Sequence, residues 1–297
     1  MGIVLGRNQY GKAECRVVRV VRDEARHELR DVNVSTCLWG DFDAAHTDGD
    51  QTRVLPTDTQ KNTCYAYAKE HGIDEIEDYA LALGRHFVED VDSVAGARVE
   101  VEEYAWDRIV VGGREHDHSW ARRGGEVRTA AVTVIGDAEW VVSGLSDLVV
   151  VKSTGSEFAG FLRDRYTTLA ETHDRVLATS LTARWRWDGA GADWGAAHAD
   201  VRQTLVERFA DVHSLALQQT LWEMGRAVLE THDGIAEIRL SAPNKHHFIV
   251  DLAPFGLDNP GEVFHADDRP YGLIQASATR DDASDPGPAW ETSEAFA

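Results

Sequence analysis

Residues 73–87 read IDEIEDYALALGRHF, and this stretch decides the fold of the first half of the chain. Its apolar residues recur at spacings of three and four, at Ile73, Ile76, Ala80, Leu83 and Phe87. That period matches an α-helix with one buried face. An earlier helix is expected to follow Thr57-Asp58-Thr59, to run through Lys69 and to stop at Gly72. The stretch therefore predicts two consecutive helices.

Segments that favour β structure lie on both sides of these helices. Residues 13–21 and 32–38 alternate in character and predict a long antiparallel hairpin, joined by the charged segment DEARHELRD. Residues 99–109 and 126–135 predict two more strands. The expected order is strand, strand, helix, helix, strand, strand.

The second half of the chain predicts the same order. Its strands and helices are expected at residues 148–152, 181–187, 201–209, 217–228, 235–240 and 247–252. The two halves share no obvious sequence, so the repeat is one of architecture, and many α+β proteins show such an order by chance. Past Arg280 the chain is acidic with two prolines, which predicts a mobile tail.

Composition limits the kind of protein this can be. The chain has 297 residues, of which 43% are hydrophobic, enough for one large domain or two ordinary ones. The net charge of −21 is spread along the chain, and such a surface repels phosphate backbones and anionic lipids. We therefore expect neither a nucleic-acid nor a membrane partner. An acidic surface whose basic residues are nearly all Arg fits a high-salt cytoplasm, but a GC-rich genome predicts the same Arg bias.

Targeting signals and cysteines favour the cytoplasm. The three cysteines, Cys15, Cys37 and Cys64, form no C-x-x-C pair, which predicts neither a disulfide framework nor a zinc ribbon. The first residues lack the apolar run of a signal peptide, and no stretch is long enough to span a bilayer. The C-terminus is not the peroxisomal Ser-Lys-Leu signal.

Common cofactor and metal motifs are missing from the sequence. Neither a phosphate-binding glycine loop nor a G-x-S-x-G nucleophile turn occurs. His116 and His118 would share one face of a strand and are the best metal candidates, but no third ligand stands at a recognised spacing. His246 and His247 would point to opposite faces. We expect no metal site and no nucleotide cofactor.

Six separated phrases carry a resemblance to a known family. They are YGK at 10–12, LPTDTQKNT at 55–63, HSWARRGGEVRTA at 118–130, KSTGSEFAGFLRDRYTTLAETHDR at 152–175, LALQQTLWEMG at 215–225 and APNKHHFIVDL at 242–252. In content and order they resemble urate oxidase, and the resemblance runs from residue 10 to about 280. Any one phrase would be weak evidence, whereas six in order are specific.

The resemblance implies a fold and an assembly. The family's tunnelling fold consists of two tandem antiparallel ββααββ units, which we expect at residues 8–137 and 138–280, with the acidic mobile tail at 281–297. Family members form homotetramers, in which the units close a barrel around a central tunnel and the active sites lie at subunit interfaces. They oxidise urate with dioxygen and water to 5-hydroxyisourate and hydrogen peroxide, without a cofactor.

The resemblance also implies catalytic residues. Lys12 of YGK matches the family's catalytic lysine, and Thr57 of PTDT matches the threonine that partners it. Asp58 matches the residue whose backbone N–H faces the substrate. In APNKHHF, Asn244 matches the residue over which dioxygen or water lies, and His246 matches the histidine of the proton relay.

Substrate-binding residues follow in the same way. Phe158 matches the ring that stacks on the purine, and Arg175 the arginine that grips it. Leu217 and Gln218 match a backbone contact and an amide contact. The family more often has valine at the Leu217 position and an aromatic residue at the His247 position. The resemblance groups Lys12, Thr57 and His246 on one side of a subunit interface and Phe158, Arg175 and Gln218 on the other.

These residue types suit a flat, electron-rich anion on chemical grounds alone. An aromatic ring offers a stacking face, a guanidinium offers a planar fork of donors, and an amide matches a lactam edge. A lysine can remove a proton if its pKa is lowered by desolvation or by a neighbouring positive charge. Two rival functions stay open: a pterin- or guanine-processing enzyme of the same fold, and a purine-binding protein without catalysis.

Overall fold

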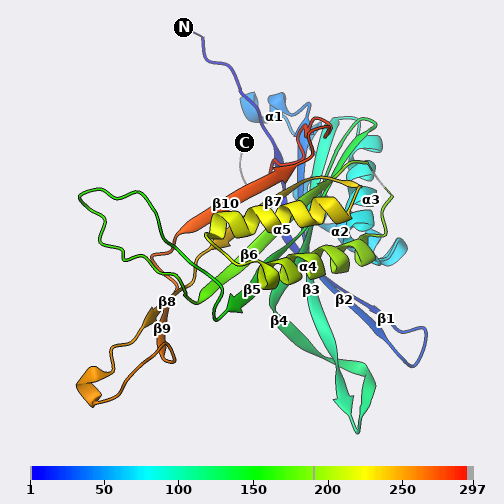
Figure 1. Ribbon diagram of the computed structural model, residues 1–297. Coiled ribbons are helices and arrows are strands. Elements are labelled where there is room, and N and C mark those ends of the chain that lie inside the picture. Colours follow the sequence, from blue (N-terminus) through cyan, green and yellow to red (C-terminus); the bar gives the residue numbers. More distant parts are fainter. Residues whose placement is uncertain (1, 190, 293–297) are drawn as a thin grey trace. The chain divides into compact units, whose positions relative to one another are not determined.

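The structure is a computed structural model that describes residues 2–189 and 191–292 (Figure 1). The chain divides into two compact units. Unit 1 comprises Met1–Gly144, Arg186–Gly195 and Ser284–Ala297, and unit 2 comprises Leu145–Trp185 and Ala196–Ala283. Both units combine helices with antiparallel strands, so the expected α+β class is confirmed.

The sheet of unit 1 is a large antiparallel one. Its strands β1 (Tyr10–Val21), β2 (Glu28–Gly40), β3 (Val94–Val111) and β4 (Arg114–Ile135) pair in chain order. Alternate residues point to one face and form the core, with Val34 opposite Val101 in the β2–β3 register. The strands are longer than predicted because β3 and β4 continue into a hairpin of mostly exposed residues.

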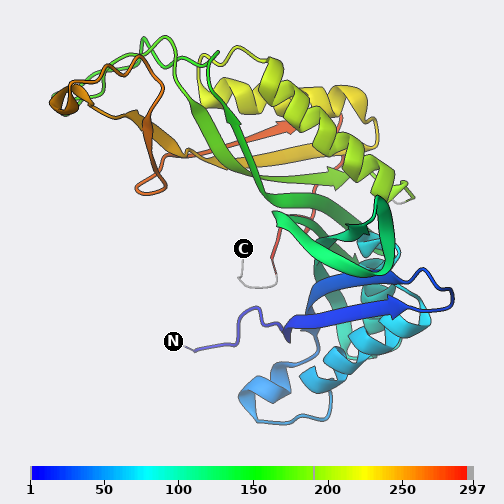
Figure 2. The same cartoon turned by 90° about the horizontal axis from the view of Figure 1, so that it is seen from below.

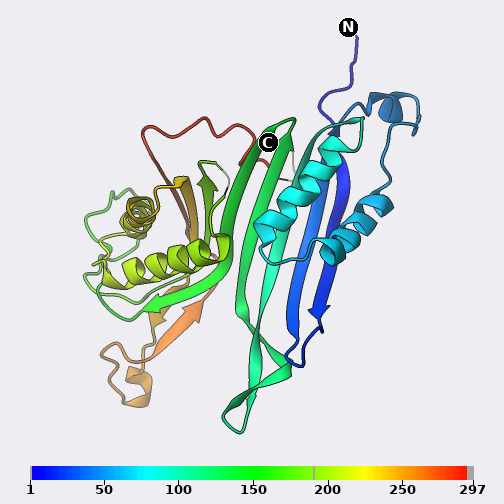
Figure 3. The ribbon, with the colours of Figure 1, turned by 90° about the vertical axis from the view of Figure 1, so that its right-hand side faces the viewer.

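Helices cover one face of this sheet (Figure 3). Helix α1 (Asp43–Thr47) is short, and α2 (Thr57–Glu70) and α3 (Ile76–Glu89) match the two helices predicted from residues 57–87. Helix α3 packs on β3 and β4, and α2 packs on β1. A Cβ at Gly84 of α3 would lie 2.8 Å from Cγ2 of Val134, so glycine allows this close packing. The apolar positions that predicted α3 are all buried, at Ile73, Ile76, Ala80, Leu83 and Phe87.

Unit 2 has the same kinds of element. Strand β5 (Ala138–Lys152) begins in unit 1 and continues into unit 2. Strand β6 (Leu177–Trp187) ends in unit 1, and helix α4 (Trp194–Asp211) begins there. Helix α5 (Leu217–Thr231) packs on β7 (Ile235–Pro243) and β10 (Leu273–Thr279), which pair antiparallel. Figure 1 shows α4 and α5 on one face of these strands.

The strand expected at residues 247–252 is present as β8 (His246–Ile249), but it lies outside the sheet that contains β7. Strand β8 does not close unit 2; it pairs with β9 (Phe264–Asp267) in a separate two-stranded sheet. Strand β10 lies beside β7 instead. Figure 2 shows β8 and β9, with the 3-10 helix η1 (Ala253–Phe255), as an arm that extends beyond β7 and β10. A β-favouring composition marks a strand but does not select its partner.

The C-terminal segment makes specific contacts within unit 1. The buried Arg98 donates from Nη2 to the carbonyl oxygen of Pro288 at 2.6 Å, and Ala289 is buried. The buried Arg186 donates to the carbonyl oxygen of Ser284 at 2.8 Å. The acidic tail expected at residues 281–297 therefore contacts unit 1 at Ser284 and Pro288, and its mobility stays a prediction. Residues 293–297 lie outside the described residues.

Candidate active site

Lys12 lies on β1 just before a β-bulge. Lys12 pairs with Thr36 of β2, but Cys15 pairs with Val34, so one extra residue stands in β1. Glu14 in the bulge has a φ of 56°, a left-handed conformation that is uncommon outside glycine. Residues three apart on a regular strand point to opposite faces. The bulge therefore turns Lys12 to the same face as Cys15.

That face of β1 is the one that α2 covers. The Cys15 thiol hydrogen-bonds to the Cys64 thiol of α2. Thr36, whose Oγ1 is 3.3 Å from the Lys12 backbone nitrogen, donates to the Gln60 side chain of α2 at 2.8 Å. All three cysteines are free and buried. Lys12 is thus held, through strand pairing and helix packing, beside the first turns of α2.

Thr57 and Asp58 are the first two residues of α2, which follows Pro56. The N–H groups of a helix's first turn have no acceptor within the helix and carry its positive dipole end. The Asp58 carboxylate accepts hydrogen bonds from Lys61 and from Asn62. The hydrogen bond from Lys61 chiefly lowers the pKa of Asp58, and the positive charge of Lys12 contributes. Lys12 and Asp58 therefore lie near each other in unit 1, and Thr57 directly precedes Asp58 on α2.

Phe158 and Arg175 form the centre of a second group, in unit 2. Backbone hydrogen bonds in both directions join Phe158 to Thr172, at 2.8 and 3.0 Å. The Arg175 backbone donates to the carbonyl oxygen of Ser156 at 2.9 Å, and its Nε donates to Ser156 Oγ at 3.4 Å. These bonds hold the Arg175 guanidinium carbon 5.4 Å from the centroid of the Phe158 ring.

Arg175 is a half-buried cation. Partial burial lowers the pKa of its guanidinium. Among the described residues of unit 2, no carboxylate forms an ion pair with it; the neighbouring Asp174 instead accepts from Thr154 and Gly155. A desolvated guanidinium beside an aromatic face is suited to bind a flat anion edge-on.

Leu217 and Gln218 begin α5, as Thr57 and Asp58 begin α2. Ala216 before them is extended, with φ −162° and ψ 153°, so their N–H groups belong to the helix's first turn. The Leu217 side chain is buried, and that of Gln218 is exposed. The arrangement fits the predicted roles, in which Leu217 acts through its backbone and Gln218 through its amide.

Asn244 and His246 lie together after the end of β7. Asn244 Nδ2 is 3.5 Å from His246 Nδ1, and Asn244 also forms a β-bridge with Thr179 of β6. The His246 ring stacks on Phe248, with the ring centroids 5.7 Å apart. His246 thus stands with Asn244 in unit 2. Because the resemblance grouped His246 with Lys12 and Thr57, which are in unit 1, the subunit that supplies His246 to a shared site stays a prediction.

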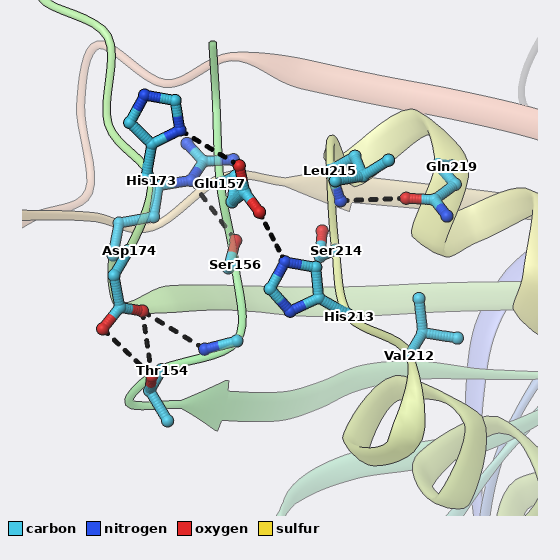
Figure 4. Close-up of polar contacts among 12 residues, drawn as sticks. Thr154, Ser156, Glu157, His173, Asp174, Val212, His213, Ser214, Leu215 and Gln219 are labelled. Atoms are coloured by element: carbon cyan, nitrogen blue, oxygen red, sulfur yellow. Dashed lines mark hydrogen bonds and ion pairs between the residues drawn. The ribbon is translucent and has the colours of Figure 1, made fainter.

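The sequence missed a polar cluster centred on Glu157, which Figure 4 shows. His213 and His173 both contact the Glu157 carboxylate, at 2.6 and 3.2 Å. These residues are 56 and 16 positions from Glu157 in sequence, so no local spacing connects them. The one signal in the sequence was that Glu157, His173 and His213 each lie close in the chain to a predicted substrate-binding residue.

His116 and His118, the metal candidates, contact each other through their rings. The rings of His116 and His118 meet edge to face, with their centroids 4.4 Å apart. Among the residues that the structure describes, no group of three His, Cys, Asp or Glu side chains is placed to hold a metal ion. Within residues 2–189 and 191–292, no helix has both the length and the apolar character needed to cross a bilayer.

Comparison with known proteins extends over nearly the whole chain. The family model described as Uricase matches residues 8–133 and 141–275. The uricase of Arthrobacter globiformis is 54% identical over 294 residues, which are 99% of this chain and 96% of that protein. The uricase of Dictyostelium discoideum is 35% identical over 277 residues, covering 92% of this chain and 96% of its own.

Solved structures agree with these matches. A crystal structure of uricase from Arthrobacter globiformis has a TM-score of 0.94 at 54% identity and covers 98% of this chain and 100% of its own. Urate oxidase from Bacillus sp. TB-90 has a TM-score of 0.82 at 22% identity, with 92% and 100% coverage, and shares the fold. By sequence and by fold, the chain belongs to the uricase family.

Proposed function

We propose that this protein is a urate oxidase, which converts urate, dioxygen and water into 5-hydroxyisourate and hydrogen peroxide. Two electrons leave urate and reduce dioxygen to peroxide, and water supplies the new hydroxyl group. The observation that carries the proposal is the Phe158–Arg175 pair. In a member of the uricase family, it places a desolvated guanidinium 5.4 Å from an aromatic ring centroid, as a flat anionic substrate requires.

Substrate binding uses the residues of unit 2. The purine stacks on Phe158, and Arg175 donates two parallel hydrogen bonds to acceptors on its edge. The Gln218 amide both donates a hydrogen bond to a lactam edge of the purine and accepts one from it. The backbone N–H of Leu217 donates to the anion, and the dipole of α5 favours its negative charge.

Proton transfer uses both units. Lys12 removes a further proton from bound urate before electrons pass to dioxygen, and Thr57 relays it to a bound water. The N–H of Asp58 faces the substrate at the start of α2. Asn244 holds dioxygen or water against the purine, and His246, 3.5 Å from Asn244 Nδ2, exchanges protons with that position.

The complete site forms where two subunits meet. In this proposal one subunit supplies Lys12, Thr57 and Asp58, and its neighbour supplies Phe158, Arg175, Leu217, Gln218, Asn244 and His246. Residues 8–137 and 138–280 are tandem repeats of one ββααββ unit, and four chains close a barrel around a tunnel. The arm of β8 and β9, inserted between β7 and β10, interrupts the second repeat. The enzyme works in the cytoplasm.

No cofactor is part of the proposed reaction, because urate itself is electron-rich enough to supply both electrons. The proposal requires only that the site hold the urate anion, remove its proton and exclude bulk water. Each of these tasks has a named group above. Activity that survives exhaustive chelation supports this point, and activity that returns only with an added metal or flavin contradicts it.

Substrate comparison separates the proposal from its rivals. The purified enzyme should release peroxide with urate and should not act on guanine or on a pterin. Turnover of guanine or a pterin in place of urate would assign the site to the heterocycle-processing enzymes of this fold. Urate binding by equilibrium dialysis without peroxide release would make the protein a purine-binding protein.

A further inference from the structure

Glu157 contacts all the segments that carry the proposed urate-binding residues of unit 2 except that of Asn244. It immediately precedes Phe158. Its Oε2 is 3.2 Å from Nδ1 of His173, two residues before Arg175. Its Oε1 is 2.6 Å from Nε2 of His213, on the loop that leads into α5. Figure 4 shows the carboxylate between the two rings.

The backbone reinforces the same junction. The Glu157 N–H donates to the carbonyl oxygen of Ser214 at 2.7 Å, and the Ser214 N–H donates to Gly155 at 2.9 Å. The buried Thr220 hydroxyl donates to Ser214 Oγ at 2.7 Å, which joins the loop to the first turn of α5. The loop that ends in Phe158 is therefore aligned with the N-terminus of α5.

The charges around Glu157 favour its ionised form. Hydrogen bonds from His213 and then His173 hold its pKa below the usual range of a glutamate. Asp174, next to His173 in sequence, accepts hydrogen bonds from Thr154 and Gly155. The His173 and His213 side chains are 76% and 58% exposed. Exposed ion pairs contribute little to folding stability, so the effect of this cluster should be on local geometry.

We propose that Glu157 is a positioning residue for urate: by binding His173 and His213, its carboxylate holds Phe158, Arg175 and the Leu217–Gln218 turn in one arrangement. Phe158, Arg175 and the start of α5 must contact the same flat ligand at the same time. A displacement of about 1 Å in one of these groups weakens the binding of the ligand by all of them. This inference rests on the proposed function and adds a residue to it.

The test compares Glu157→Ala and Glu157→Gln in the full-length enzyme. Glu157→Ala should raise KM for urate about tenfold and change kcat much less, because the contacts it aligns bind substrate and transition state alike. The anaerobic Kd for urate should rise with KM. Glu157→Gln keeps an acceptor for His213 and should recover most of the affinity at pH 8.

Comparison of the two variants separates the hydrogen bonds of residue 157 from the charge of its carboxylate, because Glu157→Gln keeps an acceptor oxygen and removes only the charge. Glu230→Ala is the control, because Glu230 is an exposed ion-pair partner of Arg226 at the other end of α5.

Two results would overturn the inference. The KM of Glu157→Ala could stay within about twofold of the parent, or Glu157→Gln could fail to reduce the rise in KM. A parent enzyme that binds urate without oxidising it leaves the Kd comparison valid and overturns the proposed reaction alone. A parent that neither binds nor oxidises urate overturns both proposals.

Discussion

The Arg175 guanidinium carbon lies 5.4 Å from the centroid of the Phe158 ring, although the two residues are on separate loop segments. The Phe158–Thr172 bridge and the Arg175–Ser156 hydrogen bonds cross between those segments and fix the pair. The pair is therefore organised before any ligand arrives. A preorganised stacking face and donor fork reduce the entropy that binding would otherwise cost.

Replacing Arg175 should weaken substrate binding first. Arg175→Ala should raise KM by about tenfold or more, since it removes a charge-assisted, bidentate contact with an anion. Arg175→Lys keeps the charge but not the planar fork and should recover only part of the loss. Steady-state kinetics and the anaerobic Kd measure both variants. An unchanged Kd for Arg175→Ala would show that urate binds elsewhere.

Replacing Lys12 should affect turnover and spare binding. Lys12→Met should lower kcat about 10²- to 10³-fold with little change in Kd, because the lysine moves a proton and does not grip the substrate. Lys69→Met, at the exposed end of α2, is the matched control and should behave as the parent. Normal turnover by Lys12→Met would disprove the assigned mechanism.

Two inactive variants should complement each other if the site is shared between subunits. Thr57→Ala and Arg175→Ala lie in different units, and in a mixed pair of subunits one interface carries both lesions and the other neither. Random exchange should restore about a quarter of the parent activity. Labelled subunits verify that exchange occurs. If exchange is complete and activity stays absent, each site lies within one chain.

Salt should influence assembly if the subunit interfaces share the acidity of the surface. The net charge is −21 per chain, and the screening length is about 8–10 Å near physiological salt. Falling salt would then loosen the oligomer and lower turnover, and added salt would restore both. Sedimentation and peroxide release, measured from molar to millimolar salt, test this. A locally neutral interface would instead give an intact, active oligomer throughout.

The helices and most strands could be predicted because their patterns are local. The apolar period of residues 73–87 predicted α3, and alternation predicted β1 and β2. Strand β10 was missed because only Ile274 and Thr279 of LIQASAT strongly favour β structure. The contacts of the C-terminal segment were missed because they depend on Arg98 and Arg186, which are distant in sequence.

The candidate site was predictable only through motifs. Resemblance supplied Phe158, Arg175 and Gln218, but it could not reveal the β-bulge that turns Lys12 toward α2, because a bulge depends on the register with β2. Glu157 was missed because its partners come from two other loops. Tertiary pairing of this kind leaves no periodic trace in a sequence.

The most direct test of the central claim is the stoichiometry of the reaction after exhaustive metal chelation. Urate absorbance, dissolved oxygen and peroxide are followed together in the purified enzyme, with Lys12→Met as the negative control. The account predicts one dioxygen consumed and one peroxide released for each urate lost, at an undiminished rate. Urate that binds but is not consumed, or consumption without peroxide, would contradict it.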